Sequence, residues 1–310
     1  MIKTKSKLVP FDEATYTHIA QLRERVYAFN TNALPSIVRL WEDSTKSSLF
    51  YIGEKYSLIR FRGHGTTYNW VVGSNNLLAK SDWQEIKQLV TDSTGNSSPI
   101  ISFISDNIFS DELRRIYDPK EMSEDAFEYI YDCREQATCA GGKFEDMRRQ
   151  TRLYFKHYGQ HTKITVDNTI TQSVITKESV MHLFDDWLGF GTDGSQNPEE
   201  ENRALAAFFE KKNRKYFGEL VIIRIFYKSK LVAFSVNEMI DEHNAINHFH
   251  KSNLNLSGIS YFTFFSTMEI LNQKGVKYLN FQEDVGIPGL RAFKQKMRPA
   301  IIDKRYAIQL

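Results

Sequence analysis

The stretch from Tyr278 to Arg291 brings together residue types that could do chemistry. It reads Tyr-Leu-Asn-Phe-Gln-Glu-Asp-Val-Gly-Ile-Pro-Gly-Leu-Arg, so Glu283 and Asp284 follow a strand-like run and precede a glycine turn. Loops at strand ends often carry functional groups, and a carboxylate there could hold an acceptor ammonium or act as a general base. We therefore take Glu283 and Asp284 as candidate catalytic residues. The alternative is that Asp284 caps the turn and Glu283 is solvated.

Basic side chains follow on the next predicted helix. Arg291 and Lys294 are one helical turn apart, so they would face the same way. The planar guanidinium groups of Arg291 and of Arg203, earlier in the chain, suit phosphate or carboxylate groups. We take Arg203, Arg291 and Lys294 as candidate donor-binding residues, that is, residues that would hold the phosphate groups of the substrate that donates the transferred group. The alternative is ordinary surface ion pairing, since glutamates occupy positions 199–201 next to Arg203.

Lys251 ends a predicted strand in which His248 and His250 alternate. An ammonium at that strand end could stabilise a donor phosphate or an oxyanion, so Lys251 is a third candidate catalytic residue. Strict alternation would place both histidines on one face of the sheet. Two histidines without a nearby carboxylate are more often polar filler than a metal site, and we expect no metal.

Gly258 opens a predicted helix after a polar run at 253–257. The amide groups at a helix N-terminus attract phosphate, which makes Gly258 a candidate donor-binding residue, although a simple helix start explains it equally well. A second basic feature is a helix face with Arg148, Arg149 and Arg152. This face could contact a nucleic-acid backbone or simply be solvated.

Composition narrows the class of protein. The chain has 310 residues and a formal net charge of +2, which argues against a strongly basic nucleic-acid binder. The two cysteines, Cys133 and Cys139, form neither a disulfide framework nor a metal-ligand spacing. No apolar run approaches the roughly 18 residues that cross a bilayer, and the first residues lack the apolar core of a signal peptide. We therefore expect a cytoplasmic protein.

The sequence contains no Ser-His-Asp or Cys-His motif that would indicate a covalent enzyme intermediate. We therefore expect the acceptor to attack the donor directly.

The predicted helices and strands that position these residues follow a similar order in the two halves of the chain. The first half has a helical stripe at 16–26, strand-like runs broken at 53–55 and 63–65, a helix around 83–90 and a strand at 100–104. The second half has a strand at 163–166, helices around 180–188 and 205–209, strands at 220–226, 231–238 and 245–251, a helix from 258, and strands at 278–281 and 305–309.

This repeated order predicts mixed sheets flanked by helices, an α/β fold of the α+β type rather than a doubly wound sheet. We expect an N-terminal domain at 1–140, a bridging helix at 141–160 and a C-terminal domain at 161–310 that carries the active site.

The stretch from Asn280 to Arg291 resembles the Asn-x-x-x-Asp-x-Gly-x-x-Gly-Leu-Arg signature of the family that contains the catalytic domain of bacterial phosphatidylglycerol lysyltransferases. Lys294 and Pro299 match positions that follow this signature, while Ala292 stands where the family usually has Lys. Other pieces agree in order and spacing: Tyr129–Tyr131, Gly142–Lys143, Arg148–Arg149, Glu201–Arg203, Val232–Ser235 with Glu238, and His248–Lys251. The resemblance covers about residues 125 to 310.

The resemblance implies two tandem GNAT-like acyltransferase domains in a soluble protein. It implies transfer of an aminoacyl group from aminoacyl-tRNA, a co-substrate rather than a tightly bound cofactor, to an amine or hydroxyl of a small molecule, peptide or lipid headgroup. The helix face with Arg148, Arg149 and Arg152 would then be a possible contact for the tRNA acceptor stem. The lysyltransferases also carry a membrane-embedded flippase domain, for which this sequence has no counterpart. The Gln/Arg-x-x-Gly-x-Gly/Ala string usual in acetyl-CoA enzymes of this fold is absent near Gly258. Two alternatives stay open: an N-acyltransferase that uses acyl-CoA, and a module that binds a ligand without turnover.

Overall fold

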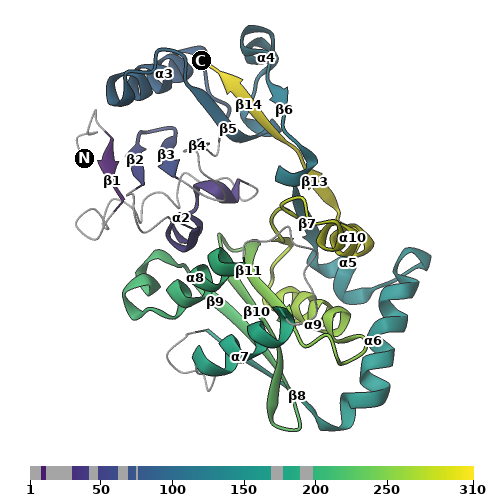
Figure 1. The fold of residues 1–310 in the computed structure, drawn as a ribbon. Helices are drawn as coiled ribbons and strands as arrows, with labels where there is room; N and C mark the ends of the chain where they lie inside the picture. Colours follow the sequence, from purple (N-terminus) through teal and green to yellow (C-terminus); the bar gives the residue numbers. More distant parts are fainter. Residues whose placement is uncertain are drawn as a thin grey trace. The chain divides into compact units, whose positions relative to one another are not determined.

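A computed structural model of the chain describes residues 8–11, 30–41, 48–61, 69–74, 76–168, 177–188 and 198–310. The chain divides into two compact units (Figure 1). The first unit comprises residues 1–128 and 303–310, and the second comprises residues 129–302. The predicted helical stripe at 16–26 and the predicted break at 63–65 lie outside the described residues.

The first unit is built on a seven-stranded sheet in the order β1-β2-β3-β4-β5-β14-β6. Its strands are β1 (Val9–Pro10), β2 (Leu49–Ile52), β3 (Ser57–Phe61), β4 (Asn69–Gly73), β5 (Ile100–Ser105), β6 (Lys120–Glu121) and β14 (Arg305–Gln309). Strands β4 and β5 are parallel, while β2, β3 and β4 form an antiparallel meander. Its described α-helices are α2 (Pro35–Trp41), α3 (Lys80–Thr94) and α4 (Asp111–Tyr117). Trp83 and Ile86 of α3 are fully buried in one core with Leu58 and Val72 of the sheet.

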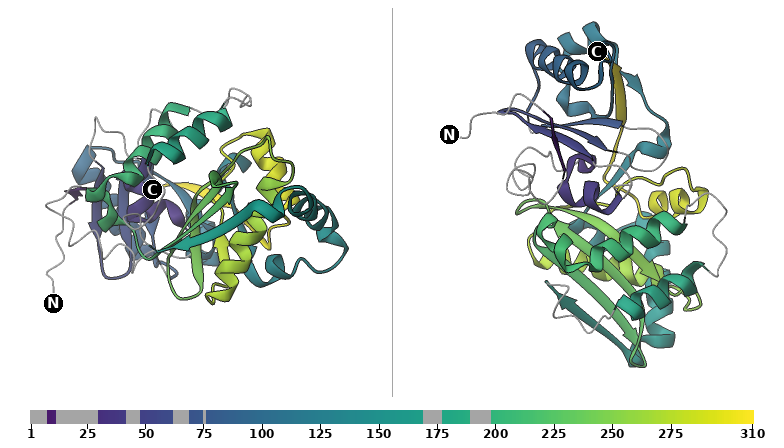
Figure 2. Two further views of the ribbon diagram at one scale, coloured as in Figure 1. Left: turned by 90° about the horizontal axis from the view of Figure 1, so that it is seen from below. Right: turned by 60° about the vertical axis from the view of Figure 1, so that its left-hand side comes forward.

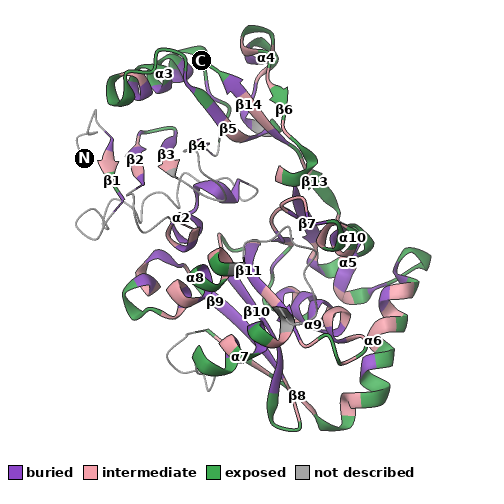
Figure 3. Cartoon of the chain, viewed as in Figure 1, coloured by how far each residue is buried: buried purple, intermediate pink, exposed green. Residues whose placement is uncertain are grey.

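The second unit has its own seven-stranded sheet, in the order β13-β7-β12-β11-β10-β9-β8. Its strands are β7 (Glu128–Asp132), β8 (Thr162–Asp167), β9 (Leu220–Tyr227), β10 (Lys230–Met239), β11 (Asn244–Ser252), β12 (Tyr278–Asn280) and β13 (Ile301–Asp303). Strands β9, β10 and β11 form a buried antiparallel meander, and β12 joins β11 in parallel (Figure 3).

Helices cover both faces of the second sheet (Figure 2). On one side α9 (Ile259–Gln273) packs Phe264 and Met268 against Val221 and Ala245, together with α5 (Cys133–Thr138), α6 (Glu145–Tyr158) and α10 (Pro288–Lys296). On the other side lie α7 (Lys177–Leu188) and α8 (Pro198–Phe209), where the ring of Phe208 lies 5.7 Å from that of Phe249. The predicted mixed α/β architecture with two sheets is therefore confirmed.

The division into units differs from the expected domain boundaries at two places. The helix at 141–160 belongs to the second unit, because Met147 lies in its core and the ring of Tyr154 stacks on Phe262 of α9 at 4.5 Å. The last strand belongs to the first unit, because β14 pairs with β5 and the fully buried Arg305 forms an ion pair of 2.6 Å with Glu128. Pairing between segments so distant in sequence leaves no local pattern from which these boundaries could be predicted.

Among the described residues, no helix is both long and apolar enough to cross a membrane.

Candidate active site

Strands β11 and β12 diverge after a short parallel ladder. Their parallel ladder joins only residues 244–246 to residues 278–280. Beyond this point β11 continues along β10 to Ser252, while the chain after Asn280 turns away. The side-chain amide of Gln282 donates to the carbonyl oxygen of Asn247 and so bridges the two diverging segments. All three predicted catalytic residues, Lys251, Glu283 and Asp284, lie on these two segments.

The loop after β12 has an unusual backbone. Gln282 and Val285 have φ values of +57° and +48°, in the left-handed region that residues with a Cβ seldom adopt, and Gly286 has φ of +78°. The Asn280 side chain accepts the N–H of Gln282 at 2.8 Å. Left-handed residues of this kind persist only where surrounding contacts hold them.

Lys294 supplies the first of those contacts. Its Nζ donates to the carbonyl oxygens of Phe281, Gln282 and Glu283 at 2.6, 3.0 and 2.6 Å. An ammonium group has three hydrogens, and three backbone carbonyls use them all. Lys294 is buried, so its geometry favours support of the loop over binding of a donor.

Asp284 is the centre of the loop and is fully buried. Its Oδ2 accepts the hydroxyl of Tyr129 at 2.6 Å and Nε of Arg291 at 2.8 Å. Its Oδ1 accepts Nη2 of Arg291 at 2.8 Å and the N–H of Gly286 at 2.9 Å. Burial alone would raise the pKa of Asp284, but the hydrogen bonds from Arg291, Tyr129 and Gly286 outweigh it and hold the pKa below its usual value.

We call Tyr129, Asp284, Arg291 and Lys294 the Asp284 cluster. Arg291 and Lys294 do face the same loop, as their spacing predicts, and Arg291 makes a bidentate pair with Asp284. Glu283 is partly exposed beside the cluster. The catalytic roles proposed for Asp284 and Glu283 stay predictions, and the four hydrogen bonds on Asp284 favour the structural alternative.

A β-bulge in β11 changes the expected faces of the histidines. Val236 of β10 lies opposite Phe249, but the next residue, Asn237, lies opposite Asn247, so His248 is the extra residue. His250 contacts the rings of Phe264, Phe281 and Phe293 on the α9 side. His248 contacts Phe217 and Glu238 on the α8 side. The prediction that both histidines share one face is therefore wrong, because the bulge reverses the alternation between them.

His248 also has the nearby carboxylate that the sequence did not reveal. Its Nε2 lies 2.6 Å from Oε2 of Glu238, and neither side chain is exposed at all. Oε1 of Glu238 accepts the N–H of Gly218 at 2.9 Å. Nδ1 of His248 is buried and has no hydrogen-bond partner among the described residues.

Lys251 lies on the same α8-facing side of β11. Its Nζ forms an ion pair of 2.7 Å with Oε1 of Glu201 in α8 and lies 5.6 Å from the ring centre of Phe184 in α7. Burial lowers the pKa of Lys251, and Glu201 opposes that shift. The second carboxylate oxygen of Glu201, Oε2, is buried and has no partner in the described part of the chain. We call Glu201, Glu238, His248 and Lys251 the His248 cluster.

The remaining predicted residues are more dispersed. Arg203 is exposed on α8. Gly258 caps α9 with φ of +81°, and a Cβ there would lie 2.3 Å from the carbonyl oxygen of Gln150, so close packing against α6 already requires glycine. Arg148 donates to the carbonyl oxygen of Gly141 at 2.7 Å, Arg149 pairs with Asp146, and Arg152 is exposed.

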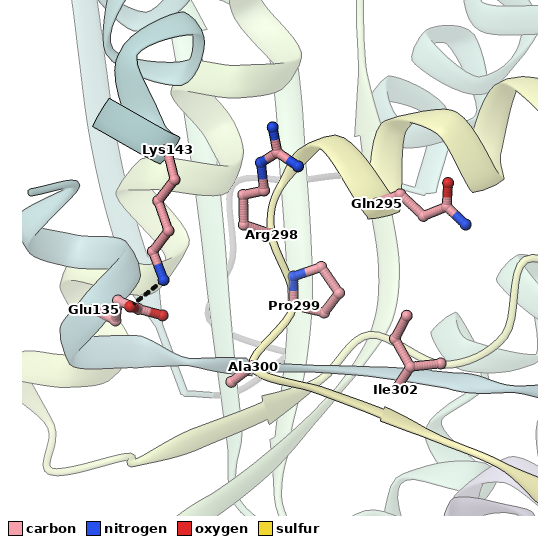
Figure 4. Close-up of a pocket in the computed structure, with 7 residues that line it drawn as sticks. All are labelled: Glu135, Lys143, Gln295, Arg298, Pro299, Ala300 and Ile302. Carbon is pink, nitrogen blue, oxygen red and sulfur yellow. Dashed lines mark hydrogen bonds and ion pairs between the residues drawn. The ribbon is translucent and has the colours of Figure 1, made fainter. Parts of the chain in front are cut away.

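A surface depression of about 560 Å³ lies elsewhere in the second unit (Figure 4). Its lining comprises Glu135, Lys143, Gln295, Arg298, Pro299, Ala300 and Ile302. Lys143 pairs there with Glu135, and the guanidinium of Arg298 points away from that pair. The depression contains no predicted site residue. Within the described ranges, no group of three or more His, Cys, Asp or Glu side chains is arranged to hold a metal ion.

Known structures resemble the chain along its full length. A conserved protein of unknown function from Bacteroides thetaiotaomicron superposes with a TM-score of 0.77 at 19% identity, with 100% of both chains covered. The C-terminal domain of a putative lysylphosphatidylglycerol synthetase from Agrobacterium fabrum gives a TM-score of 0.60 at 15% identity, covering 96% of this chain and 92% of that one. A tandem GNAT protein from the clavulanic acid biosynthesis pathway gives 0.50 at 7% identity, covering 98% of each. These likenesses establish a GNAT-like fold.

No curated protein gives a significant match to the sequence. The family described as phosphatidylglycerol lysyltransferase, C-terminal, matches residues 66–309, which is more than half of the chain. This match includes every residue of the Asp284 and His248 clusters. It also begins well before residue 125, where the resemblance noted from motifs began. The chain therefore belongs to the family of the phosphatidylglycerol lysyltransferase C-terminal domain.

Proposed function

We propose that this protein is an aminoacyltransferase that moves an aminoacyl group from aminoacyl-tRNA to an amine or hydroxyl acceptor. Its family and its GNAT-like fold support acyl transfer in general. A lipid headgroup is the acceptor class that fits the family best, with small molecules and peptides as the other candidates.

The observation that favours aminoacyl-tRNA over acyl-CoA as the donor is the second carboxylate oxygen of Glu201, Oε2. An aminoacyl group differs from an acetyl group by an ammonium next to the reacting carbonyl. Oε2 of Glu201 is shielded from water and has no partner among the described side chains, while Oε1 is held by Lys251. A buried carboxylate oxygen without a partner is costly, and an ammonium hydrogen would satisfy it. A plain acyl group offers nothing to this atom.

Lys251 would act on the same donor. An ammonium fixed in a water-poor site can stabilise the negative charge that develops on the carbonyl oxygen during attack. In our proposal the acceptor nitrogen or oxygen attacks the ester carbonyl carbon directly, and the bond from that carbon to the ribose oxygen breaks. Neither cysteine suits a covalent alternative, because burial raises the pKa of Cys133 to about 12 and that of Cys139 to about 11.

Thermal unfolding against a ligand panel tests the donor. We expect a non-hydrolysable aminoacyl-adenosine analogue or charged tRNA to raise the Tm, and CoA and acetyl-CoA to leave it unchanged. Glu201→Gln should remove the shift caused by the analogue, and it should also lower the Tm of the free protein because the buried Lys251 loses its counter-charge. Asn202→Asp, an exposed change on the same helix, is the matched control. A shift with CoA compounds alone would replace our proposal with an acyl-CoA transferase, and binding without donor consumption would indicate a module without turnover.

A further inference from the structure

We propose that His248 is the proton acceptor of the transfer reaction and that Glu238 is the residue that positions it. This inference rests on the proposed function, and it adds a catalytic residue to which neither the sequence motifs nor the family assign a role. A histidine whose one ring nitrogen is held by a buried carboxylate, and whose other nitrogen is left without a partner, has the arrangement of an oriented base.

The hydrogen bonds of Glu238 decide which nitrogen is basic. Oε1 of Glu238 accepts the N–H of Gly218, and Oε2 lies 2.6 Å from Nε2 of His248. With Glu238 as an ionised carboxylate, which is its form in our proposal, Oε2 accepts and the hydrogen between Glu238 and His248 belongs to Nε2. The imidazole then carries its lone pair on Nδ1. This nitrogen has no partner among the residues that the structure describes.

The β-bulge explains why His248 and Lys251 lie on the same side of the sheet. A regular strand would direct residue 248 to the α8 side and Phe249 to the α9 side. The extra residue instead lets both side chains point to the α8 side. Lys251, two residues after Phe249, thereby lies on the same face as His248 and pairs there with Glu201. The bulge interrupts the ladder between β10 and β11, and its result is that both ion pairs of the His248 cluster lie on one face.

The described surroundings of His248 are apolar apart from the Glu238 carboxylate. The rings of Phe217 and Phe208 cover this part of the sheet, and the ring of Phe217 lies 5.5 Å from that of His248. An isolated imidazolium would be costly in such apolar surroundings, but the Glu238 carboxylate would form an ion pair with it. His250 lacks this support, since burial lowers its pKa to about 4.

The proposed step balances. The acceptor nitrogen or oxygen forms a bond to the carbonyl carbon of the donor ester as its proton passes to Nδ1 of His248. The bond between that carbon and the ribose oxygen breaks. The imidazolium then returns the proton to the ribose oxygen, which leaves tRNA with a free hydroxyl and His248 neutral.

The first test needs no substrate. We would label histidine with ¹⁵N and assign His248 by comparison with His248→Gln. The expected spectrum at neutral pH shows a neutral ring with hydrogen on Nε2 and none on Nδ1. Glu238→Gln should redistribute the hydrogen between the two nitrogens. A ring with hydrogen on Nδ1 in the wild type would overturn the proposal, because that nitrogen could then accept no proton.

The second test measures turnover with a mixed pool of radiolabelled aminoacyl-tRNA. The acceptor is whichever of phosphatidylglycerol vesicles, glycerol or a short peptide supports the reaction in the wild type. We expect His248→Gln to lower kcat by about 100-fold or more with little change in KM for tRNA, and Glu238→Gln to lower it by about tenfold. His243→Gln, at an exposed histidine outside the cluster, is the control. Circular dichroism and Tm would verify that each variant is folded.

The outcomes separate the two proposals. If the wild type consumes no aminoacyl-tRNA with any acceptor, the proposed function fails, and with it this role of His248. If the wild type is active and folded His248→Gln keeps a rate within threefold of it, only the present inference fails. If His248→Gln does not fold, Glu238→Gln and the tautomer measurement decide.

Discussion

The Asp284 and His248 clusters both bury charged side chains in the same unit, yet they use their hydrogen-bonding capacity differently. In the Asp284 cluster both carboxylate oxygens accept two hydrogen bonds each, and Lys294 donates to three carbonyls. In the His248 cluster one oxygen of Glu201 and one nitrogen of His248 have no partner in the described chain. The first network is complete without a ligand. The second leaves acceptors that a ligand could satisfy.

This difference teaches that burial and charge alone do not mark an active site. The Asp284 cluster holds the left-handed backbone of residues 282 and 285 in place, which is a structural task. Asp284 and Lys294 have no hydrogen-bonding capacity left for a substrate. In the His248 cluster, buried atoms without a hydrogen-bond partner lower the stability of the folded protein. A role in binding or catalysis would explain why they are present.

Replacing Lys251 should produce the largest effect. We expect Lys251→Met to reduce kcat/KM for aminoacyl-tRNA by about 100- to 1000-fold, because the ammonium that faces the developing charge is lost. The unfolding midpoint should also fall, because the buried Glu201 carboxylate loses its ion-pair partner even though methionine fills the space of the lysine stem. The double variant Lys251→Met/Glu201→Gln keeps the charge balance and serves as the control. An active, folded Lys251→Met protein would remove the functional contrast between the clusters.

Replacing Asp284 should act mainly on stability. Asp284→Asn removes the charge that holds the guanidinium of Arg291 and cannot accept all four hydrogen bonds, so we expect a loss of about 3 kcal/mol in the free energy of unfolding. Urea unfolding measures it. The rate per folded molecule should stay within a few fold of the wild type. A lost rate at unchanged stability would return Asp284 to the catalytic role predicted from the sequence.

Replacing Lys294 should also lower stability rather than activity, but by less than replacing Asp284. Lys294→Met leaves the carbonyls of residues 281–283 without their shared donor, and we expect a loss of about 2 kcal/mol. Its turnover should follow the wild type when corrected for the folded fraction. Lys296→Met, two residues further along α10, removes an exposed lysine that pairs with Asp146 at the surface and is the control for stability, with an expected loss well below that of Lys294→Met. A specific loss of donor affinity in Lys294→Met would instead support donor binding.

Much of the fold could be predicted from the sequence because it depends on local patterns. The order of helices and strands predicts mixed sheets, and the Asn280–Arg291 signature identifies the family. The boundaries between units could not be predicted in this way. They depend on β14 pairing with β5, about 200 residues earlier in the chain, and on the burial of Arg305 against Glu128.

The candidate site was only partly predictable, for a related reason. Lys251 was singled out, but Glu201 and Glu238 were noted only within motifs, because their partners lie on other elements. The apolar pattern gives no local signal of the bulge, because β11 is covered on both faces and adjacent residues such as Ala245 and Ile246 are both buried. The bulge separates the faces of His248 and His250, and it becomes visible only in the pairing of β11 with β10.

His250 offers the smallest test, and it separates the two histidines by pH. Burial lowers its pKa to about 4, from about 6.5 in an unfolded chain. Between these values the unfolded state binds a proton that the folded state does not. The contribution of His250 to stability is therefore complete above about pH 6.5 and is lost as the pH falls towards 4, with a slope of up to about 1 kcal/mol per pH unit. His250→Phe should flatten this part of the profile in urea unfolding between pH 4 and 7, because phenylalanine has no proton to bind and suits the rings of Phe264, Phe281 and Phe293. An unchanged slope in this variant would show that His250 is charged in the folded protein, and only then would it compete with His248 for the role of base.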